Sequence, residues 1–228
     1  MRELRKRNLR FILLDHDAVL PSHDMIWFGS EHEVARCHDE GQPIAVTTET
    51  IESAVDEGVR LQRGIVDVIE LCFGVDPGPR PGIAWLADGV VLGVSQLEFI
   101  EDVAQHIKTI AERIQCRSWR VRIGNGAPLI RDQIINDCLT NSMHVEQVNE
   151  AKTSRGLLRH NHVVSAIRIA LIRGSEVTEF REITPTDGDI REIQRQSRKR
   201  SNGRKTISSQ QAYEVAIGQV SMDEALNE

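Results

Sequence analysis

The sequence has no long hydrophobic run: none approaches the ~18 to 20 consecutive apolar residues that a membrane-spanning helix requires. The basic start of the chain is followed by a short apolar stretch, Phe11 to Leu14, which Asp15 interrupts. That stretch is too short for the apolar region of a secretory signal peptide. We therefore expect a protein without membrane segments that functions in the cytoplasm.

Cysteine is scarce, and the four cysteines (Cys37, Cys72, Cys116 and Cys138) include no Cys-x-x-Cys pair. They are widely separated and lie in apolar or amphipathic stretches. A zinc site or a disulfide framework is usually marked by closer, regular spacing. The pattern favours buried free thiols in a reducing compartment, with disulfides or zinc as the alternative.

The chain carries a formal net charge of −6, which argues against non-specific nucleic-acid binding by the whole surface. The charge is uneven, because the segment from Arg195 to Lys205 contains six basic residues and no acidic one. A local basic patch can bind phosphate groups even on an acidic protein. The alternative is a solvated segment without a partner. The predicted phosphate contacts are Arg198, Lys199, Arg200, Arg204 and Lys205.

The most informative stretch of the chain runs from Phe73 to Gly93. An apolar run ends in a single carboxylate, Asp76, after which Pro77 and Gly78 turn the chain. A second apolar run leads into Asp88-Gly89, a dipeptide that predicts a two-residue β-hairpin turn. An isolated acid at a strand end, beside exposed backbone, is suited to holding a cation or contacting a phosphate chain.

Residues 1–70 are expected to form a small α/β N-terminal domain. Strands are predicted at Phe11 to Leu14, Met25 to Phe28 and Pro43 to Thr48. Thr50 can cap a helix, and the apolar residues that follow it up to about Ile65 recur at helical spacing.

Residues 71–174 are expected to form a mixed β-sheet with flanking helices. Hairpin-linked strands over Cys72 to Phe99 precede alternating helices and strands, and this order indicates both antiparallel and parallel pairing. The predicted later elements are a helix over Val103 to Ile114, a strand over Trp119 to Ile123, a helix over Leu129 to Leu139, a strand over Val145 to Val148, and a helix over Val163 to Leu171.

Residues 175–228 are expected to form a basic linker and a short helical tail. Thr184-Pro-Thr-Asp-Gly-Asp predicts a turn-rich linker before the basic segment. Two short helices are predicted at Ser208 to Ile217 and Ser221 to Leu226. The second begins with a capping-box pattern of Ser221 and Glu224.

Three passages, in this order, resemble the RuvC/YqgF branch of the RNase H-like superfamily. Val75-Asp-Pro-Gly-Pro-Arg-Pro-Gly-Ile-Ala looks like the first strand and turn of that branch. Ile123-Gly-Asn-Gly-Ala-Pro-Leu-Ile-Arg131 and Val148-Asn-Glu-Ala-Lys-Thr-Ser154 look like the YqgF-type domain of the Tex transcription-associated proteins. The resemblance covers residues of about 72–174 and implies an RNase H-like fold for the mixed sheet.

The resemblance also implies a site. Active members of the superfamily cut phosphodiester bonds with two divalent cations, Mg²⁺ or Mn²⁺, held by several carboxylates. Asp76 matches the first-strand aspartate and Glu150 the second ligand, so both are expected to bind metal. The usual acid at the start of the last helix falls at or near His162, with His160 as its substitute. Histidine can ligate a metal such as Mn²⁺ or accept a proton, so the implied catalytic residues are Asp76, Glu150 and His162.

By this resemblance the chain is a nucleic-acid-processing protein and a candidate metal-dependent endonuclease, with DNA or RNA as its partner. RuvC-like relatives are often dimers, so a homodimer is a further expectation. The alternative is a non-catalytic nucleic-acid-binding adaptor on an RNase H-like scaffold, which the missing helix carboxylate favours.

A third alternative is a haloacid dehalogenase-type phosphatase. Phe11-Ile-Leu-Leu-Asp-His-Asp-Ala-Val-Leu20 fits the start of that family, in which Asp15 would attack phosphorus and Asp17 would act as general acid and base. Thr47 and Lys108 could serve as its second and third motifs. Asn125 stands where the acidic fourth motif is expected, so that motif is missing. The glycines on either side of it allow a phosphate to approach the N-terminus of the next helix, or they serve only a tight turn that needs positive φ.

Overall fold

The structure, a computed structural model, describes residues 1–15, 18–37, 41–65, 67–149 and 162–227. The chain divides into two compact units, and each is made of segments that are separated in the sequence. The three-part division expected above stays a prediction. The first unit comprises Met1–Cys72, Trp85–Gly93 and Lys108–Trp119, and the second comprises Phe73–Ala84, Val94–Ile107 and Arg120–Glu228.

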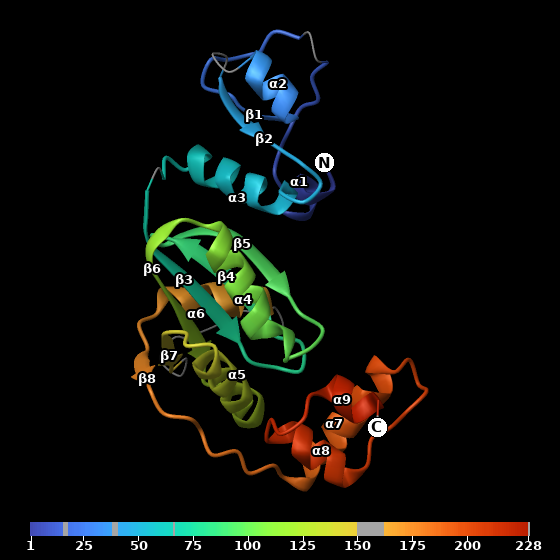
Figure 1. Cartoon of the computed structure of the whole chain (residues 1–228). Coiled ribbons are helices and arrows are strands. Elements are labelled where there is room, and N and C mark those ends of the chain that lie inside the picture. Colours follow the sequence, from blue (N-terminus) through green and yellow to red (C-terminus); the bar gives the residue numbers. More distant parts are fainter. Residues whose placement is uncertain (16–17, 38–40, 66, 150–161, 228) are drawn as a thin grey trace. The chain divides into compact units, whose positions relative to one another are not determined.

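The N-terminal part contains a two-stranded parallel sheet and three helices (Figure 1). The strands predicted near residues 25–28 and 43–48 are confirmed, although the second ends earlier, at Ala45. The predicted helix after Thr50 is also confirmed, with Thr50 at its N-cap position, although the Thr50 side chain forms no capping hydrogen bond. The elements are α1 (Arg2–Lys6), β1 (Ile26–Gly29), α2 (Glu31–Arg36), β2 (Gln42–Ala45) and α3 (Ile51–Gln62).

The strand predicted at Phe11 to Leu14 is wrong. Residues 11–15 form no strand, and the side chains of Ile12 and Leu13 are 58% and 70% exposed. An apolar run becomes a strand only when a neighbouring strand pairs with it and a face of the sheet buries it. In the two-stranded sheet, β1 pairs with β2 alone.

The six-stranded sheet confirms the predicted mixed pairing. Its strand order is β5-β4-β3-β6-β7-β8, with β6 parallel to β7 and β7 antiparallel to β8 (Figure 1). The short strand β8 was not predicted. The strands are β3 (Val68–Asp76), β4 (Gly82–Ala87), β5 (Val90–Gln96), β6 (Cys116–Gly124), β7 (Val145–Val148) and β8 (Ser175–Val177).

The predicted hairpin turn at Asp88-Gly89 joins β4 to β5. Both residues have positive φ, 48° and 82°, as a tight hairpin turn of the primed type requires. The Asp88 carboxylate also accepts hydrogen bonds from the backbone N–H groups of Ile69 and Glu70, at 3.1 and 2.9 Å. The turn residue therefore ties the hairpin to the beginning of β3.

Helices predicted along residues 103–171 are confirmed as α4 (Asp102–Arg113), α5 (Pro128–Thr140) and α6 (His162–Leu171). The middle of β3, from Leu71 to Val75, is buried at every position. A strand buried on both faces reads as a continuous apolar run rather than an alternating one. All four cysteines are free thiols, and burial raises the pKa of Cys138 to about 12.

Three helices form the C-terminal part: α7 (Asp187–Arg200), α8 (Ser209–Ala216) and α9 (Met222–Asn227). The three helices lie together (Figure 1) and pack around one apolar cluster, against which Leu129 of α5 also packs. The turn-rich linker predicted at residues 184–189 is wrong in its second half, because α7 begins at Asp187 and continues through most of the basic segment. Thr186 begins α7 with a capping box to Asp189.

None of the helices in the described part of the chain is long and apolar enough to cross a membrane.

Candidate functional site

Asp76 and His162 lie together in the second unit. Asp76 is the last residue of β3 and His162 the first of α6, and Nδ1 of His162 lies 2.8 Å from Oδ2 of Asp76. The Asp76 side chain is 16% exposed and that of His162 is 41% exposed. The carboxylate is therefore half-enclosed, while the imidazole can be reached from solvent.

Glycines bring the two residues together. A Cβ atom at Gly74 of β3 would lie 2.0 Å from the carbonyl oxygen of Ala166 in α6, and one at Gly82 would lie 2.4 Å from the carbonyl oxygen of His162. No side chain fits at either position, so α6 can approach β3 and the start of β4 at backbone distance. This close packing sets the start of α6 over the end of β3.

The hydrogen bond defines what each group can do. Burial raises the pKa of Asp76 above its usual value, and the hydrogen bond and charge of His162 oppose that rise. When Asp76 is ionised it can only accept, so Nδ1 of a neutral His162 donates and Nε2 is left as an acceptor. An imidazole oriented in this way can take a proton from water or from a substrate hydroxyl.

The loop after β6 adjoins the same end of the sheet. A Cβ atom at Gly126 would lie 3.6 Å from the carbonyl oxygen of Pro77, the residue after Asp76. In this loop the side-chain oxygen of Asn125 accepts hydrogen bonds from Arg131 and Gln147, at 2.7 and 2.8 Å. Asn125 therefore organises polar side chains beside the strand ends.

Two of the predicted site residues, Glu150 and His160, lie outside the described residues, as does Asp17. Within the described ranges, no group of three or more His, Cys, Asp or Glu side chains could hold a metal ion. Asp76 and His162 thus supply two side chains that can ligate a metal, and these two are hydrogen-bonded to each other. Asp15 is exposed and follows no strand.

The five predicted phosphate contacts differ in how the protein uses them. Lys199 forms an ion pair with Glu98 at 2.9 Å, and Nζ of Lys205 donates to the carbonyl oxygen of Leu226 at 3.0 Å. Arg200 stacks over the Phe99 ring and pairs with two acids. Arg198 and Arg204 are exposed and form no ion pair with the described residues. The basic segment is therefore largely engaged within the protein itself.

Sequence reasoning missed a buried carboxylate, Glu146 of β7, whose side chain is 5% exposed. It accepts hydrogen bonds from Arg120, Arg122 and the backbone N–H of Gly174, at 2.6, 2.8 and 3.1 Å. Burial raises the pKa of Glu146, but these hydrogen bonds outweigh it and lower the pKa to about 2. The only sequence signal was an acid inside a strand, with two arginines inside another.

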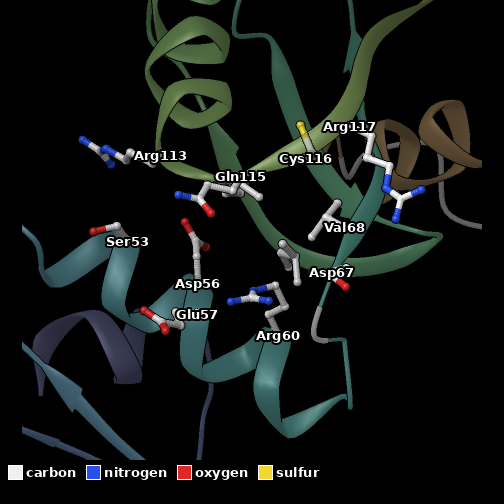
Figure 2. A pocket seen from close by; sticks show the side chains of 12 residues that line it. Ser53, Asp56, Glu57, Arg60, Asp67, Val68, Arg113, Gln115, Cys116 and Arg117 are labelled. Atoms are coloured by element: carbon white, nitrogen blue, oxygen red, sulfur yellow. The ribbon is translucent and has the colours of Figure 1, made fainter.

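A pocket of about 590 Å³ lies in the first unit, and its lining includes neither Asp76 nor His162. Figure 2 shows Asp56 and Arg60 of α3 and Gln115 among its lining side chains. Asp56 is buried, bonds to Arg7 and accepts a hydrogen bond from the Trp85 indole at 3.3 Å. Because Asp56 already has these partners, it stabilises the packing of α3 rather than offering a free acid.

Residues 186–228 match a family described as a three helical bundle domain, in agreement with the three helices α7, α8 and α9. Comparison of the chain with curated proteins and with solved structures finds no match. The family match is confined to the C-terminal part and does not include Asp76 or His162.

Proposed function

We propose that this chain is a nucleic-acid-processing protein of the RuvC/YqgF type, with an RNase H-like sheet, in which Asp76 and His162 form the centre of the site. The observation that carries the proposal is the 2.8 Å contact between these two residues. The resemblance pairs a first-strand acid with a residue at the start of the last helix, and Asp76 and His162 occupy the ends of β3 and α6.

His162 is the proton acceptor of this proposal. Its Nδ1 is engaged by Asp76, which orients the ring and leaves Nε2 to take a proton from the attacking water. Asp76 has a second oxygen, Oδ1, that forms no hydrogen bond with the described residues, and such a carboxylate oxygen suits a hard cation.

Metal dependence is part of the same proposal. Asp76 and Glu150, with His162 or His160 as a further ligand, would hold Mg²⁺ or Mn²⁺, and such an ion would stabilise negative charge on the phosphate oxygens. The engagement of Nδ1 by Asp76 favours His162 as proton acceptor over His162 as ligand. The implied homodimer and the cytoplasmic location also remain predictions; light scattering after size exclusion would test the former.

A non-catalytic adaptor is the second candidate. It is favoured by the residue at the start of α6, where His162 stands in place of the carboxylate that the resemblance implies. The phosphatase alternative is not favoured by any contact, because residues 11–15 do not form the strand that would present Asp15.

The test is a cleavage assay on labelled single-stranded, duplex and branched DNA and on RNA, with Mg²⁺, Mn²⁺ or a chelator. Asp76→Asn keeps the shape of the side chain and should abolish cleavage, and His162→Gln should reduce it about 100-fold or more if His162 is the general base. Asp24→Asn, which changes an exposed aspartate in the first unit, is the matched control and should cleave normally. Full activity of Asp76→Asn would refute the proposal. Binding of a nucleic acid without cleavage under every condition would support the adaptor.

A further inference from the structure

Glu98 bridges two cations that come from different parts of the second unit. One carboxylate oxygen accepts a hydrogen bond from Nη2 of Arg80, and the other lies 2.9 Å from Nζ of Lys199. The side chains of Arg80, Glu98 and Lys199 are 51%, 47% and 57% exposed. Ion pairs this exposed contribute little to stability, so a ligand can separate them at small cost.

The turn that carries Arg80 lies beside His162. It covers residues 77–81, and both of its ends adjoin His162. A Cβ atom at Gly78 would lie 3.5 Å from Cε1 of His162, and one at Gly82 would lie 2.4 Å from its carbonyl oxygen. The turn is also fastened to the segment before Glu98, because the Leu97 N–H donates to the carbonyl oxygen of Pro81 at 2.9 Å.

Lys199 lies at the other end of the bridge, in the last turn of α7. The neighbouring Arg200 is occupied by Asp223 and by the Phe99 ring, 4.1 Å away, and so holds α7 against the segment that carries Glu98. Arg200 therefore positions the helix. The ammonium group of Lys199 and the guanidinium of Arg80 bind the same exposed carboxylate, that of Glu98.

A carboxylate between an arginine and a lysine occupies the place that a phosphate group would take, because guanidinium and ammonium groups bind the oxygens of either anion. We infer that the phosphodiester backbone of a nucleic acid displaces Glu98 and binds between Arg80 and Lys199. These two residues then lead a strand from the C-terminal bundle to the Asp76–His162 pair. The inference rests on the proposed function and adds a binding site to it.

The test measures the dissociation constant of a short fluorescein-labelled oligothymidylate by fluorescence anisotropy over a range of salt concentrations. Glu98→Gln removes the competing charge, and it should tighten binding about three- to tenfold at low salt, with the gain fading as salt rises. Lys199→Gln in the Glu98→Gln background should cancel the gain and reduce the salt dependence.

Glu101→Gln is the matched control. It makes the same charge change in the same segment, but its partner Arg200 remains held by Asp223. If Glu98→Gln binds no more tightly than Glu101→Gln, while the wild type binds and cleaves the oligonucleotide, the inferred site is wrong and the proposed function is unaffected. If neither the wild type nor Glu98→Gln binds the oligothymidylate, the inferred site is wrong, and the cleavage assay on the other nucleic acids decides the proposed function separately. If Glu98→Gln bound polyglutamate more tightly than the wild type does but did not bind the oligothymidylate more tightly, the site would be one for an acidic polypeptide and the inference would be wrong.

Discussion

The backbone of Ala166 leaves no room for a side chain at Gly74: a Cβ atom there would lie 2.0 Å from the Ala166 carbonyl oxygen. The contact joins the middle of β3 to α6, the two elements that end and begin with Asp76 and His162. A glycine in a strand interior costs conformational entropy, so its presence here is explained by the approach of the helix.

Gly74→Ala should therefore destabilise the protein by about 1–3 kcal/mol, since backbone atoms must move to admit the new methyl group. Urea unfolding followed by circular dichroism measures the change. Gly188→Ala is the matched control, because its nearest neighbour, Oγ1 of Thr186, is 3.6 Å away. That variant lies inside helix α7 and should be neutral or more stable. Equal effects of the two substitutions would argue against the close packing.

Glu146 should make stability depend on pH. Its pKa is lowered to about 2 in the folded protein, so the unfolded chain binds more protons between about 4.5 and 2. The stabilisation is present above pH 4.5 and is lost as the pH falls through about 2; the shift corresponds to about 3 kcal/mol.

Glu146→Gln should abolish this acid dependence and cost about 3–5 kcal/mol at neutral pH, because two arginines lose their buried partner. Thermal unfolding across the acid range provides the measurement. Glu176→Gln, on the paired strand β8 and 61% exposed, is the comparison and should change stability by less than about 1 kcal/mol. An unchanged acid transition in Glu146→Gln would show that other carboxylates control it.

Asp76 should behave in the opposite direction. Burial raises its pKa, so the folded protein loses stability as rising pH ionises Asp76. Asp76→Asn removes that ionisation and can still accept the hydrogen bond of His162. We expect its melting temperature at neutral pH to equal or exceed that of the wild type, with a smaller difference in acid. A marked loss of stability at neutral pH would instead show that the charged pair stabilises the fold.

Arg200 should hold the three helical bundle in place. It is paired with Asp223 and Glu101 and stacks on Phe99, and its side chain is only 18% exposed. Arg200→Ala should cost about 1–2 kcal/mol and speed amide hydrogen exchange in α7 and α9. Arg195→Ala, which removes an exposed pair within α7, should cost less than about 0.5 kcal/mol. Unaltered exchange in Arg200→Ala would refute this positioning role.

Several local predictions were confirmed because they depend only on interactions between residues that are close together in the chain. Asp88 and Gly89 adopt the positive φ values of the predicted hairpin turn. Ser221 and Glu224 form the predicted capping box, with their backbone N–H groups donating at 2.8 and 3.2 Å. The same signal was present at Thr186 and Asp189, but the surrounding proline and glycine favoured a turn, and α7 was therefore missed.

The sequence by itself determined where most of the strands and helices of the sheet region lie, because apolar runs, turn residues and caps depend on neighbours in the chain. Tertiary structure alone decided that the apolar run at residues 11–14 would find no strand to pair with. It also decided the contacts of the site. Asp76 and His162 are 86 residues apart and Glu98 and Lys199 are 101 apart. The first pair meets because Gly74 and Gly82 let α6 approach β3 and β4, and the second because Arg200 holds the end of α7 on Phe99. Neither contact can be predicted from the charge pattern of a short segment.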